Sequence, residues 1–486
     1  MSNRRFLRFA SPNERRTISR EDVGFYNALI IAGIYEVEDE DAEIVSPRSF
    51  IQPLKYCIEK HPFLSVVVKD KHTEQPAFEA VFNIDLHDHL LITQEHGAEH
   101  EKELELFESV LPPILDRSWP ADIPPWRVIV VPLESLPGSA TKRCLIVFSF
   151  SHTLGDGMSA MGFHRTFLDG WRKATRTDQT GSFLTSAPNR SLSEPFDTPE
   201  RLPISWSFLL APLVAVYLPT FITSLLGLRP TASPVNAGTW TGSSIFFKPP
   251  PAPPSRLRIL EIDAQTVRKA LQVSRNHNTK LTATLHQFII RALSKAIPNP
   301  SITNFVSGTA VDMRKSIGIP SEEWGLFVNA HYETHPRSLD IAERSLSDGT
   351  WAAASSMTQK LAECGTRLQD QAVGLLRYAP SIRNWTLGKI GKQRDCSYEL
   401  SNLLAFEDST SGTQQHAIKI EKMLFTRPAN PISAPLEFNV VSVKDGSLIC
   451  IVSWQEGALG VQLEDEMPLV NGVLSSVHAD FEALID

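Results

Sequence analysis

The sequence predicts an α/β (α+β) protein with two domains, each built from a mixed sheet with flanking helices. The chain has 486 residues, and at ~100–200 residues per domain this length predicts more than one hydrophobic core. Short apolar runs typical of strands alternate with longer amphipathic stretches typical of helices. A stiff, proline-rich segment at 230–255 separates two such series. We therefore expect an N-terminal half at 1–200, a connecting segment at 201–255 and a C-terminal half at 256–486.

The composition is that of a globular protein, with 42% hydrophobic and 21% charged residues. A net charge of -8 argues against a nucleic-acid partner. The five cysteines are widely spaced, without a Cys-x-x-Cys motif or a His–Cys cluster. This pattern fits a reducing compartment and predicts no metal site. No apolar signal core follows the first arginines, so we expect a cytoplasmic protein.

The N-terminal half begins with a stretch of ambiguous secondary structure. Ser19 and Asp22 form a weak capping box. Residues 25–35 are apolar apart from Asn27, and their β-branched side chains leave helix and strand equally open.

A helix is predicted at 47–60, where apolar residues recur at helical spacing. Ser46 can cap this helix, and Pro53 either kinks it or marks its true start. His61 precedes a proline and is interpreted as a turn residue. The next expected elements are a strand at 65–68, a charged amphipathic helix at 99–111, and a strand at 124–132 that a turn at 133–141 connects to its neighbour.

That neighbour is an almost wholly apolar run at 145–150, which predicts a strand buried on both faces. A helix follows at 158–174. Between them, His152 lies at the end of a rigid strand, where a loop opens towards the helix. A neutral imidazole held on such a scaffold suits a general base. Asp156 could equally be only the N-cap of the helix.

Residues 202–228 carry no charge and are interrupted by Pro212 and Pro219. Three interpretations stay open. The segment is a flap over a substrate tunnel, an anchor on a membrane surface or lipid droplet, or a transmembrane span, for which ~20 apolar residues suffice.

The C-terminal half repeats the alternation of strands and helices. Asp263 is expected to cap its first helix. The expected elements are a strand at 257–262, helices at 264–276 and 282–297, strands at 305–311 and 324–330, a hairpin of 435–443 with 447–454, and a terminal helix at 475–485.

Three motifs occur in a specific order along the chain: His-x-x-x-Asp-Gly at 152–157, Val-Asp-x-Arg at 311–314 and Gly-x-Phe-Val-Asn at 325–329. Together they resemble the acyl-CoA-dependent acyltransferase superfamily, which includes chloramphenicol acetyltransferase, the plant BAHD enzymes and the condensation domains of peptide synthetases. Segments 11–27 and 453–457 are similar to the fungal alcohol O-acetyltransferases. The BAHD motif Asp-Phe-Gly-Trp-Gly is absent, and Ser151 stands where condensation domains carry a first histidine. The resemblance is therefore to the alcohol acetyltransferase branch.

The resemblance implies two chloramphenicol-acetyltransferase-like domains with an active-site tunnel at their interface. It also implies roles for named residues. His152 would be the general base, Asp156 would pair with Arg314 to hold the loop, and Gly157 would let the backbone turn where a side chain would clash. Trp324 and Asn329 are candidates for the oxyanion or substrate side.

The implied reaction transfers acetyl from acetyl-CoA to a small apolar alcohol of secondary metabolism. CoA is then a co-substrate, no cofactor is bound permanently, and no cysteine is required. We expect a monomer, cytoplasmic or peripheral to the endoplasmic reticulum or lipid droplets through 202–228. The alternatives are a non-catalytic binding protein of the same fold, a condensation-type enzyme with a carrier-bound acyl donor, and a metal-dependent hydrolase. The last is weak because no other histidine lies at ligand spacing from His152.

Overall fold

The computed structural model describes the chain except for residues 1–3, 39–42, 94–101, 137, 175–180, 218–221, 223–232, 248–253, 342, 409–417, 429–431 and 486. At 212–217 only the backbone is described.

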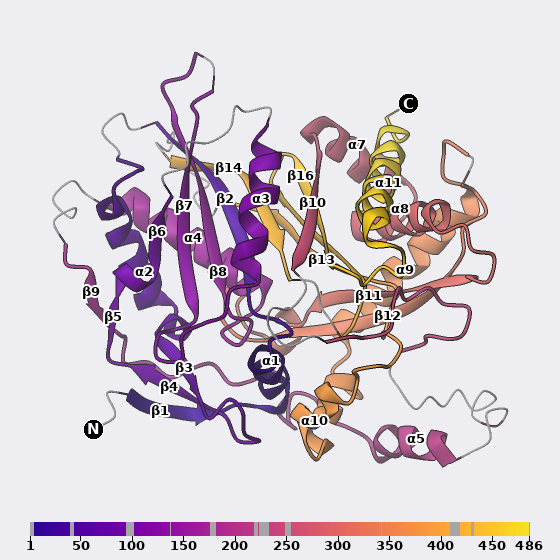
Figure 1. Cartoon of the computed structure of the whole chain (residues 1–486), viewed down its shortest axis with the longest axis horizontal. Coiled ribbons are helices and arrows are strands. Elements are labelled where there is room, and N and C mark those ends of the chain that lie inside the picture. Colours follow the sequence, from indigo (N-terminus) through magenta and orange to yellow (C-terminus); the bar gives the residue numbers. More distant parts are fainter. Residues whose placement is uncertain are drawn as a thin grey trace.

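A five-stranded mixed sheet forms the centre of the N-terminal half (Figure 1). Helices α2 and α4 pack against one another, and α4 packs on β2. The ambiguous stretch at 25–35 forms most of β2, and every residue of that strand is buried, so no alternation is visible in its sequence. The sheet order is β14 (Ile418–Thr426), β2 (Leu29–Val37), β8 (Lys142–Phe150), β7 (Trp126–Leu133) and β6 (Leu90–Ile92), with helices α2 (Ile51–Lys60), α3 (Glu103–Leu115) and α4 (Gly157–Lys173).

A six-stranded sheet forms the C-terminal half, and helices α8 and α11 pack together over its outer face. The predicted mixed sheets with flanking helices are confirmed. The sheet order is β10 (Ser255–Ile262), β16 (Leu448–Gln455), β15 (Leu436–Val443), β13 (Tyr398–Phe406), β11 (Asn304–Asp312) and β12 (Val328–Pro336), with helices α7 (Ala264–Asn276), α8 (Leu281–Ala296), α9 (Asp348–Thr366) and α11 (Leu463–Glu482).

Smaller elements fill the remaining surface. A three-stranded sheet contains β1 (Arg4–Phe9), β4 (Ala77–Val81) and β3 (Val66–Lys69), and a two-stranded sheet contains β5 (Asn83–Asp85) and β9 (Leu184–Ser186). The other helices are α1 (Pro12–Asp22), α5 (Trp206–Tyr217) and α10 (Ile382–Leu387), with short 3-10 turns at Pro47–Phe50, Pro62–Ser65, Leu86–Asp88, Lys315–Ile317 and Ala372–Tyr378.

Strand β14 ties the two halves together. It comes from the C-terminal part of the chain but pairs antiparallel with β2 of the first sheet, as its orange arrow among the purple strands shows (Figure 1). A shared apolar core lies between α3, the first sheet and the strands β10 and β16. The chain therefore crosses from one sheet to the other twice at this junction, and residue 427 lies at the return crossing.

Several predicted boundaries were wrong for local reasons. The first helix is α1, whose capping box is formed by Ser11 and Glu14; Ser19 lies inside that helix. Ser46 makes no capping bond, because residues 47–50 form a 3-10 turn before α2. Strand β12 begins only at Val328, since Gly325 adopts a φ of 148° that breaks the extended run.

The ends of two further helices also differ from the prediction. The terminal helix α11 begins at Leu463 and includes Pro468 within its second turn, where the proline removes one helical hydrogen bond. Helix α3 continues through Pro112 and Pro113 to Leu115. Residues 99–101 of the predicted helix lie outside the described part of the chain.

The connecting segment at 201–255 is described only in part. Trp240 is buried in the core of the C-terminal half, and Ile245 is buried against Phe25 and Ile432. Trp206 on α5 is 77% exposed. Within the described residues, no helix has both the length and the apolar character needed to cross a bilayer. Most of 218–232 and all of 248–253 fall outside the description, and the division into halves at this segment stays a prediction.

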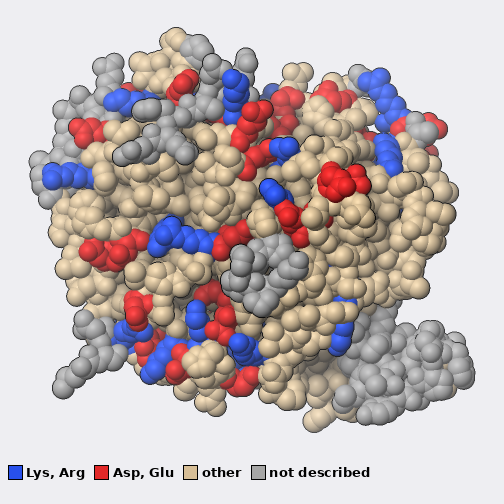
Figure 2. All heavy atoms as spheres, viewed as in Figure 1, with Lys and Arg blue, Asp and Glu red and all other residues tan. Residues whose placement is uncertain are grey.

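Positive and negative side chains are interspersed over the face seen in Figure 2. Ion pairs also join segments far apart in the sequence, such as Arg256 with Glu456 at 2.6 Å.

Candidate active site

The loop between β8 and α4 holds His152 at the end of a covered strand. Every residue of β8 after Lys142 is buried, so its neighbours fix where the strand ends. The Nδ1 atom of His152 lies 2.8 Å from the carbonyl oxygen of Gly155. A carbonyl oxygen only accepts hydrogen bonds, and Nδ1 therefore carries the imidazole proton. Nε2 keeps its lone pair, as a general base requires.

The surroundings keep His152 neutral. Burial is the main cause that lowers its pKa, to about 4, and the charges of Arg16 and Arg20 lower the pKa further. The hydrogen bond to the Gly155 carbonyl and the charge of Asp156 act in the opposite direction. At neutral pH the imidazole is thus unprotonated, the state in which it can accept a proton.

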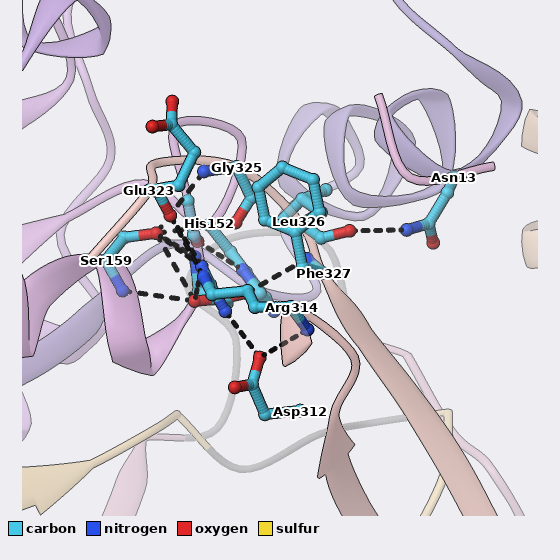
Figure 3. Close-up of polar contacts among 11 residues, drawn as sticks. Asn13, His152, Ser159, Asp312, Arg314, Glu323, Gly325, Leu326 and Phe327 are labelled. Atoms are coloured by element: carbon cyan, nitrogen blue, oxygen red, sulfur yellow. Dashed lines mark hydrogen bonds and ion pairs between the residues drawn. The ribbon is translucent and has the colours of Figure 1, made fainter. Parts of the chain in front are cut away.

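A network lies behind this loop, formed by the buried residues Asp156, Ser159 and Arg314 and the exposed Asp312; we call it the Arg314 cluster (Figure 3). Nη2 of Arg314 donates to Oδ1 of Asp156 at 2.7 Å, and Nη1 donates to Oδ1 of Asp312 at 2.8 Å. Only 1% of the Arg314 side chain and 2% of the Asp156 side chain are exposed. The contact joins the two halves of the chain, 158 residues apart.

Arg314 does not bind Asp156 through two parallel bonds, a geometry frequent in Arg–carboxylate pairs. Arg314 divides its donors between two carboxylates and the carbonyl of Glu323, which accepts from Nε at 3.0 Å and from Nη2 at 2.9 Å. Asp156 also accepts from the backbone N–H of Ser159 and from that of Phe327. Asp156 therefore caps α4 and holds Arg314 at the same time, so the interpretation as a cap alone was wrong.

Two glycines allow this close packing. A Cβ on Gly157 would lie 2.5 Å from the Leu403 side chain, so the residue avoids a clash, although its φ does not require glycine. A Cβ on Gly155 would lie 2.7 Å from Oγ of Ser159. Gly155 was not singled out from the sequence, where its place between the two motif residues was the only signal.

The oxyanion candidates have other contacts in the structure. Trp324 is 2% exposed and packs against the rings of His61 and Phe150. The Asn329 amide donates to Gln371 and to Sγ of Cys364. Among the described residues, Nε1 of Trp324 is buried without a hydrogen-bond partner, and the role of both residues on the oxyanion or substrate side stays a prediction.

Helix α1 and the residues after it contact the same loop, which the sequence did not reveal. Glu21, in the last turn of α1, accepts a hydrogen bond from Ser151. The Tyr26 ring lies 5.5 Å from the His152 ring, centroid to centroid. The i, i+4 spacing of Arg16 and Arg20 was a signal that both share one face of a helix.

A second buried ion cluster lies on the inner face of the C-terminal sheet. Glu399 on β13 and Glu437 on β15 are paired across neighbouring parallel strands. Their neighbours Leu400, Leu436 and Phe438 face the helix-covered core, so the alternation of a strand directs both glutamates to the opposite face. Arg427, at the return crossing after β14, binds both carboxylates. We call Glu399, Arg427 and Glu437 the Arg427 cluster.

Among the residues that the structure describes, no group of three His, Cys, Asp or Glu side chains is arranged to hold a metal ion.

Comparison with known proteins identifies the family of the chain. The sequence profile of the alcohol acetyltransferase family matches residues 50–470. A probable alcohol acetyltransferase of Aspergillus fumigatus is 22% identical over 461 residues, which cover 90% of this chain and 92% of that protein.

Solved structures share the fold. The trichothecene 15-O-acetyltransferase TRI3 of Fusarium sporotrichioides superposes with a TM-score of 0.65 at 12% identity, covering 98% of this chain and 95% of that one. TRI101 of F. graminearum, solved with ethyl coenzyme A, has a TM-score of 0.58 at 14% identity and covers 96% of this chain and 98% of that one. The predicted two-domain acyltransferase fold is thereby confirmed. The chain belongs to the alcohol acetyltransferase family, and it is an acyltransferase that passes an acyl group from acyl-CoA to an alcohol.

Proposed function

We propose that His152 is the general base of acetyl transfer from acetyl-CoA to an alcohol. Nε2 accepts the proton of the acceptor hydroxyl while the hydroxyl oxygen forms a bond to the thioester carbonyl carbon. The tetrahedral intermediate then collapses, the carbon–sulfur bond breaks, and the imidazolium returns the proton to the CoA thiolate. The products are the ester and free CoA. No covalent enzyme intermediate forms, so no cysteine takes part.

One observation carries this proposal: the bond from Nδ1 of His152 to the Gly155 carbonyl leaves Nε2 as the basic nitrogen. The Arg314 cluster supports it by fixing the loop that carries the imidazole. Asp156 and Arg314 act here as positioning residues, because Arg314 donates to Asp156 and to the Glu323 carbonyl on the far side of the loop. A base held by packing and hydrogen bonds needs little reorganisation before it reacts.

The direct test is thiol release from acetyl-CoA by the His152→Ala variant. Removal of a general base typically lowers turnover ~10²–10⁴-fold, and we expect a loss of that size with CoA affinity and the thermal unfolding midpoint unchanged. His61→Ala is the matched control, since His61 is also buried but hydrogen-bonds Thr166. Retention of more than about a tenth of wild-type turnover by His152→Ala would contradict the assignment.

The donor distinguishes this function from a condensation-type reaction. We expect acetyl-CoA to be turned over without any carrier protein. Faster turnover of an acetyl group on a carrier phosphopantetheine than of acetyl-CoA would favour the condensation alternative. The predicted monomer is checked in the same preparations by light scattering.

We also propose that α5 contacts a lipid surface, at the endoplasmic reticulum or a lipid droplet. Trp206 is 77% exposed and Leu210 is 46% exposed, and both are apolar side chains that suit a membrane interface. The start of α5 is fixed by Asp370, which accepts from the backbone N–H and the hydroxyl of Ser205. We expect flotation with phosphatidylcholine liposomes, reduced by the double change Trp206→Gln with Leu210→Gln. Unchanged flotation, or none in the wild type, would rule this contact out.

The acceptor was predicted to be a small apolar alcohol of secondary metabolism. The trichothecene acetyltransferase of similar fold supports a secondary-metabolite acceptor. The polar groups that surround His152 bear on a second question, which is how polar the acceptor is.

A further inference from the structure

Helix α1 passes along the His152 loop from one end to the other. Near its start, the amide of Asn13 donates to the Leu326 carbonyl at 3.5 Å, next to the loop that binds Asp156. At its end, Glu21 accepts from Ser151. The residues between these two contacts, Arg16 and Arg20 among them, therefore lie beside the candidate active site.

Arg16 and Arg20 point their positive charges towards this site. They are separated by one helical turn and share a face of α1. Both charges lower the pKa of His152. Burial raises the pKa of Glu437 well above its ordinary value, and the charge of Arg20 acts in the opposite direction. Among the described residues, neither guanidinium has an ion pair, and Nε of each is buried without a hydrogen-bond partner. Two donor groups are thus unused next to the base.

The Arg427 cluster faces the same place from the other half. Nε of Arg427 donates to Asn439 at 2.8 Å, and its two terminal nitrogens bind Glu399 and Glu437. Glu437 is fully buried, and its Oε1 atom has no partner among the described residues.

Tyr26 lies between the two sets of groups. Its ring contacts His152. Burial raises the pKa of its phenol, and the charges of Arg427, Glu437 and Arg20 also act on this pKa. The Tyr26 hydroxyl is buried and also has no hydrogen-bond partner in the described structure. Few buried polar atoms in a native protein lack a hydrogen-bond partner. Here several such atoms lie on both sides of His152.

On the basis of the proposed function, we propose that the acceptor is an oxygen-rich alcohol rather than an apolar one. Beside the reacting hydroxyl it carries a carbonyl or carboxylate oxygen, which accepts from Arg16 and Arg20. A further hydroxyl forms a hydrogen bond with Oε1 of Glu437. This inference replaces the apolar acceptor expected from the sequence.

The physical reason is the asymmetry of hydrogen bonding in a buried site. An apolar alcohol would displace water from these groups and leave them unpaired, which costs more than the missing bonds alone. A site that hydrogen-bonds its substrate discriminates strongly against an analogue that lacks the partner atom. A guanidinium pair matches carbonyl and carboxylate oxygens, because Arg presents its donors in a planar fork.

The test compares acceptors that differ only in the second oxygen group: cyclohexanol, 3-hydroxycyclohexanone and 3-hydroxycyclohexanecarboxylate. Thiol release from acetyl-CoA gives kcat/KM for each. We expect the better of the two oxygenated acceptors to exceed cyclohexanol by about 10- to 100-fold, as for hydrogen bonds to charged groups. A preference for the carboxylate over the ketone would identify an acidic acceptor, and the reverse a neutral one. Equal or higher kcat/KM for cyclohexanol would overturn the inference.

Variants assign the preference to the two arginines. Arg16→Met and Arg20→Met should each lower the ratio of kcat/KM for an oxygenated acceptor to kcat/KM for cyclohexanol. The ratio falls because KM for the oxygenated acceptor rises. Arg15→Met is the matched control on the same helix. Nε of Arg15 is also unpaired among the described residues, but its Nη1 donates to the Glu74 carbonyl, and the variant should keep the wild-type ratio. Circular dichroism of each variant checks the fold, and a ratio unchanged in folded Arg16→Met and Arg20→Met would overturn the assignment.

The same assay separates this inference from the proposed function. If wild type releases thiol with none of the three acceptors while a broad alcohol panel is also inert, the proposed function fails. If cyclohexanol is acetylated as well as the oxygenated acceptors, the transferase stands and only the oxygen-rich acceptor is wrong.

Discussion

The two buried arginine clusters near His152 differ in how completely their polar atoms are paired. In the Arg314 cluster each guanidinium nitrogen has a partner, and so does each oxygen of Asp156. In the Arg427 cluster the guanidinium is also fully bonded, but Oε1 of Glu437 has no partner in the described structure. Both clusters contain buried charged side chains, and both join distant parts of the chain.

The difference indicates two kinds of task. A closed network holds a loop in one place, because any displacement leaves a buried charge unpaired. An open network contains a buried polar atom without a hydrogen-bond partner. This arrangement suits a site in which a ligand supplies the missing bond. We therefore assign positioning to the Arg314 cluster and acceptor recognition to the Arg427 cluster.

The largest expected effect is on stability, from Arg314→Met. Removing one partner of a buried ion pair typically costs ~3–5 kcal/mol, here because Asp156 keeps a buried charge. Chemical denaturation should show a loss of that size. The double change Asp156→Asn with Arg314→Met should be less destabilising than Arg314→Met alone. Strictly additive losses in this cycle would show that the two side chains do not act as a pair.

A smaller effect is expected from Gly155→Ala, which tests how tightly the closed cluster is packed. The added methyl would press on Oγ of Ser159, which accepts from Arg314 at 3.2 Å. Overpacking of this kind costs ~1–3 kcal/mol, and turnover should fall with it. Gly472→Ala is the control, because no atom lies within 4 Å of its Cβ position on α11. It should stabilise the protein by ~0.4–1 kcal/mol, and equal effects of the two changes would contradict the packing argument.

The smallest expected effect is a shift in the pH dependence of kcat/KM, which tests whether Arg20 acts on His152. The pKa of His152 is lowered from 6.5 to about 4, so kcat/KM should stay level as the pH falls through 6.5 and decline only near pH 4. Arg20→Met removes a positive charge, which raises the pKa of His152 and moves this decline to higher pH. A decline centred at 6.5 in the wild type, or a shift to lower pH in Arg20→Met, would be inconsistent with the described surroundings.

Much of the fold could be predicted from local patterns. Asp263 caps α7 as expected, and α8 lies within one residue of its predicted ends, because both helices have clear periodicity and boundaries. Strand β2 stayed ambiguous, since burial on both faces removes the alternation that marks a strand.

The site residues could be predicted only where they belong to a short sequence motif. His152, Asp156 and Gly157 belong to one loop, and Arg314 followed from its motif context. The Arg427 cluster depends on the parallel register of β13 and β15 and on the return crossing at residue 427. No local pattern encodes such long-range pairing, so these side chains emerged only from the structure.

The division of tasks is tested most directly by acceptor kinetics of Asp156→Asn and Glu437→Gln, measured side by side with one oxygen-rich acceptor at saturating acetyl-CoA. Asp156→Asn should lower kcat by misplacing His152 and leave the acceptor KM nearly unchanged. Glu437→Gln, of similar shape, should raise the acceptor KM more than it lowers kcat, because it alters the unpaired oxygen and not the base. If both variants instead change the same kinetic parameter in the same proportion, the two clusters do not have the separate roles assigned to them.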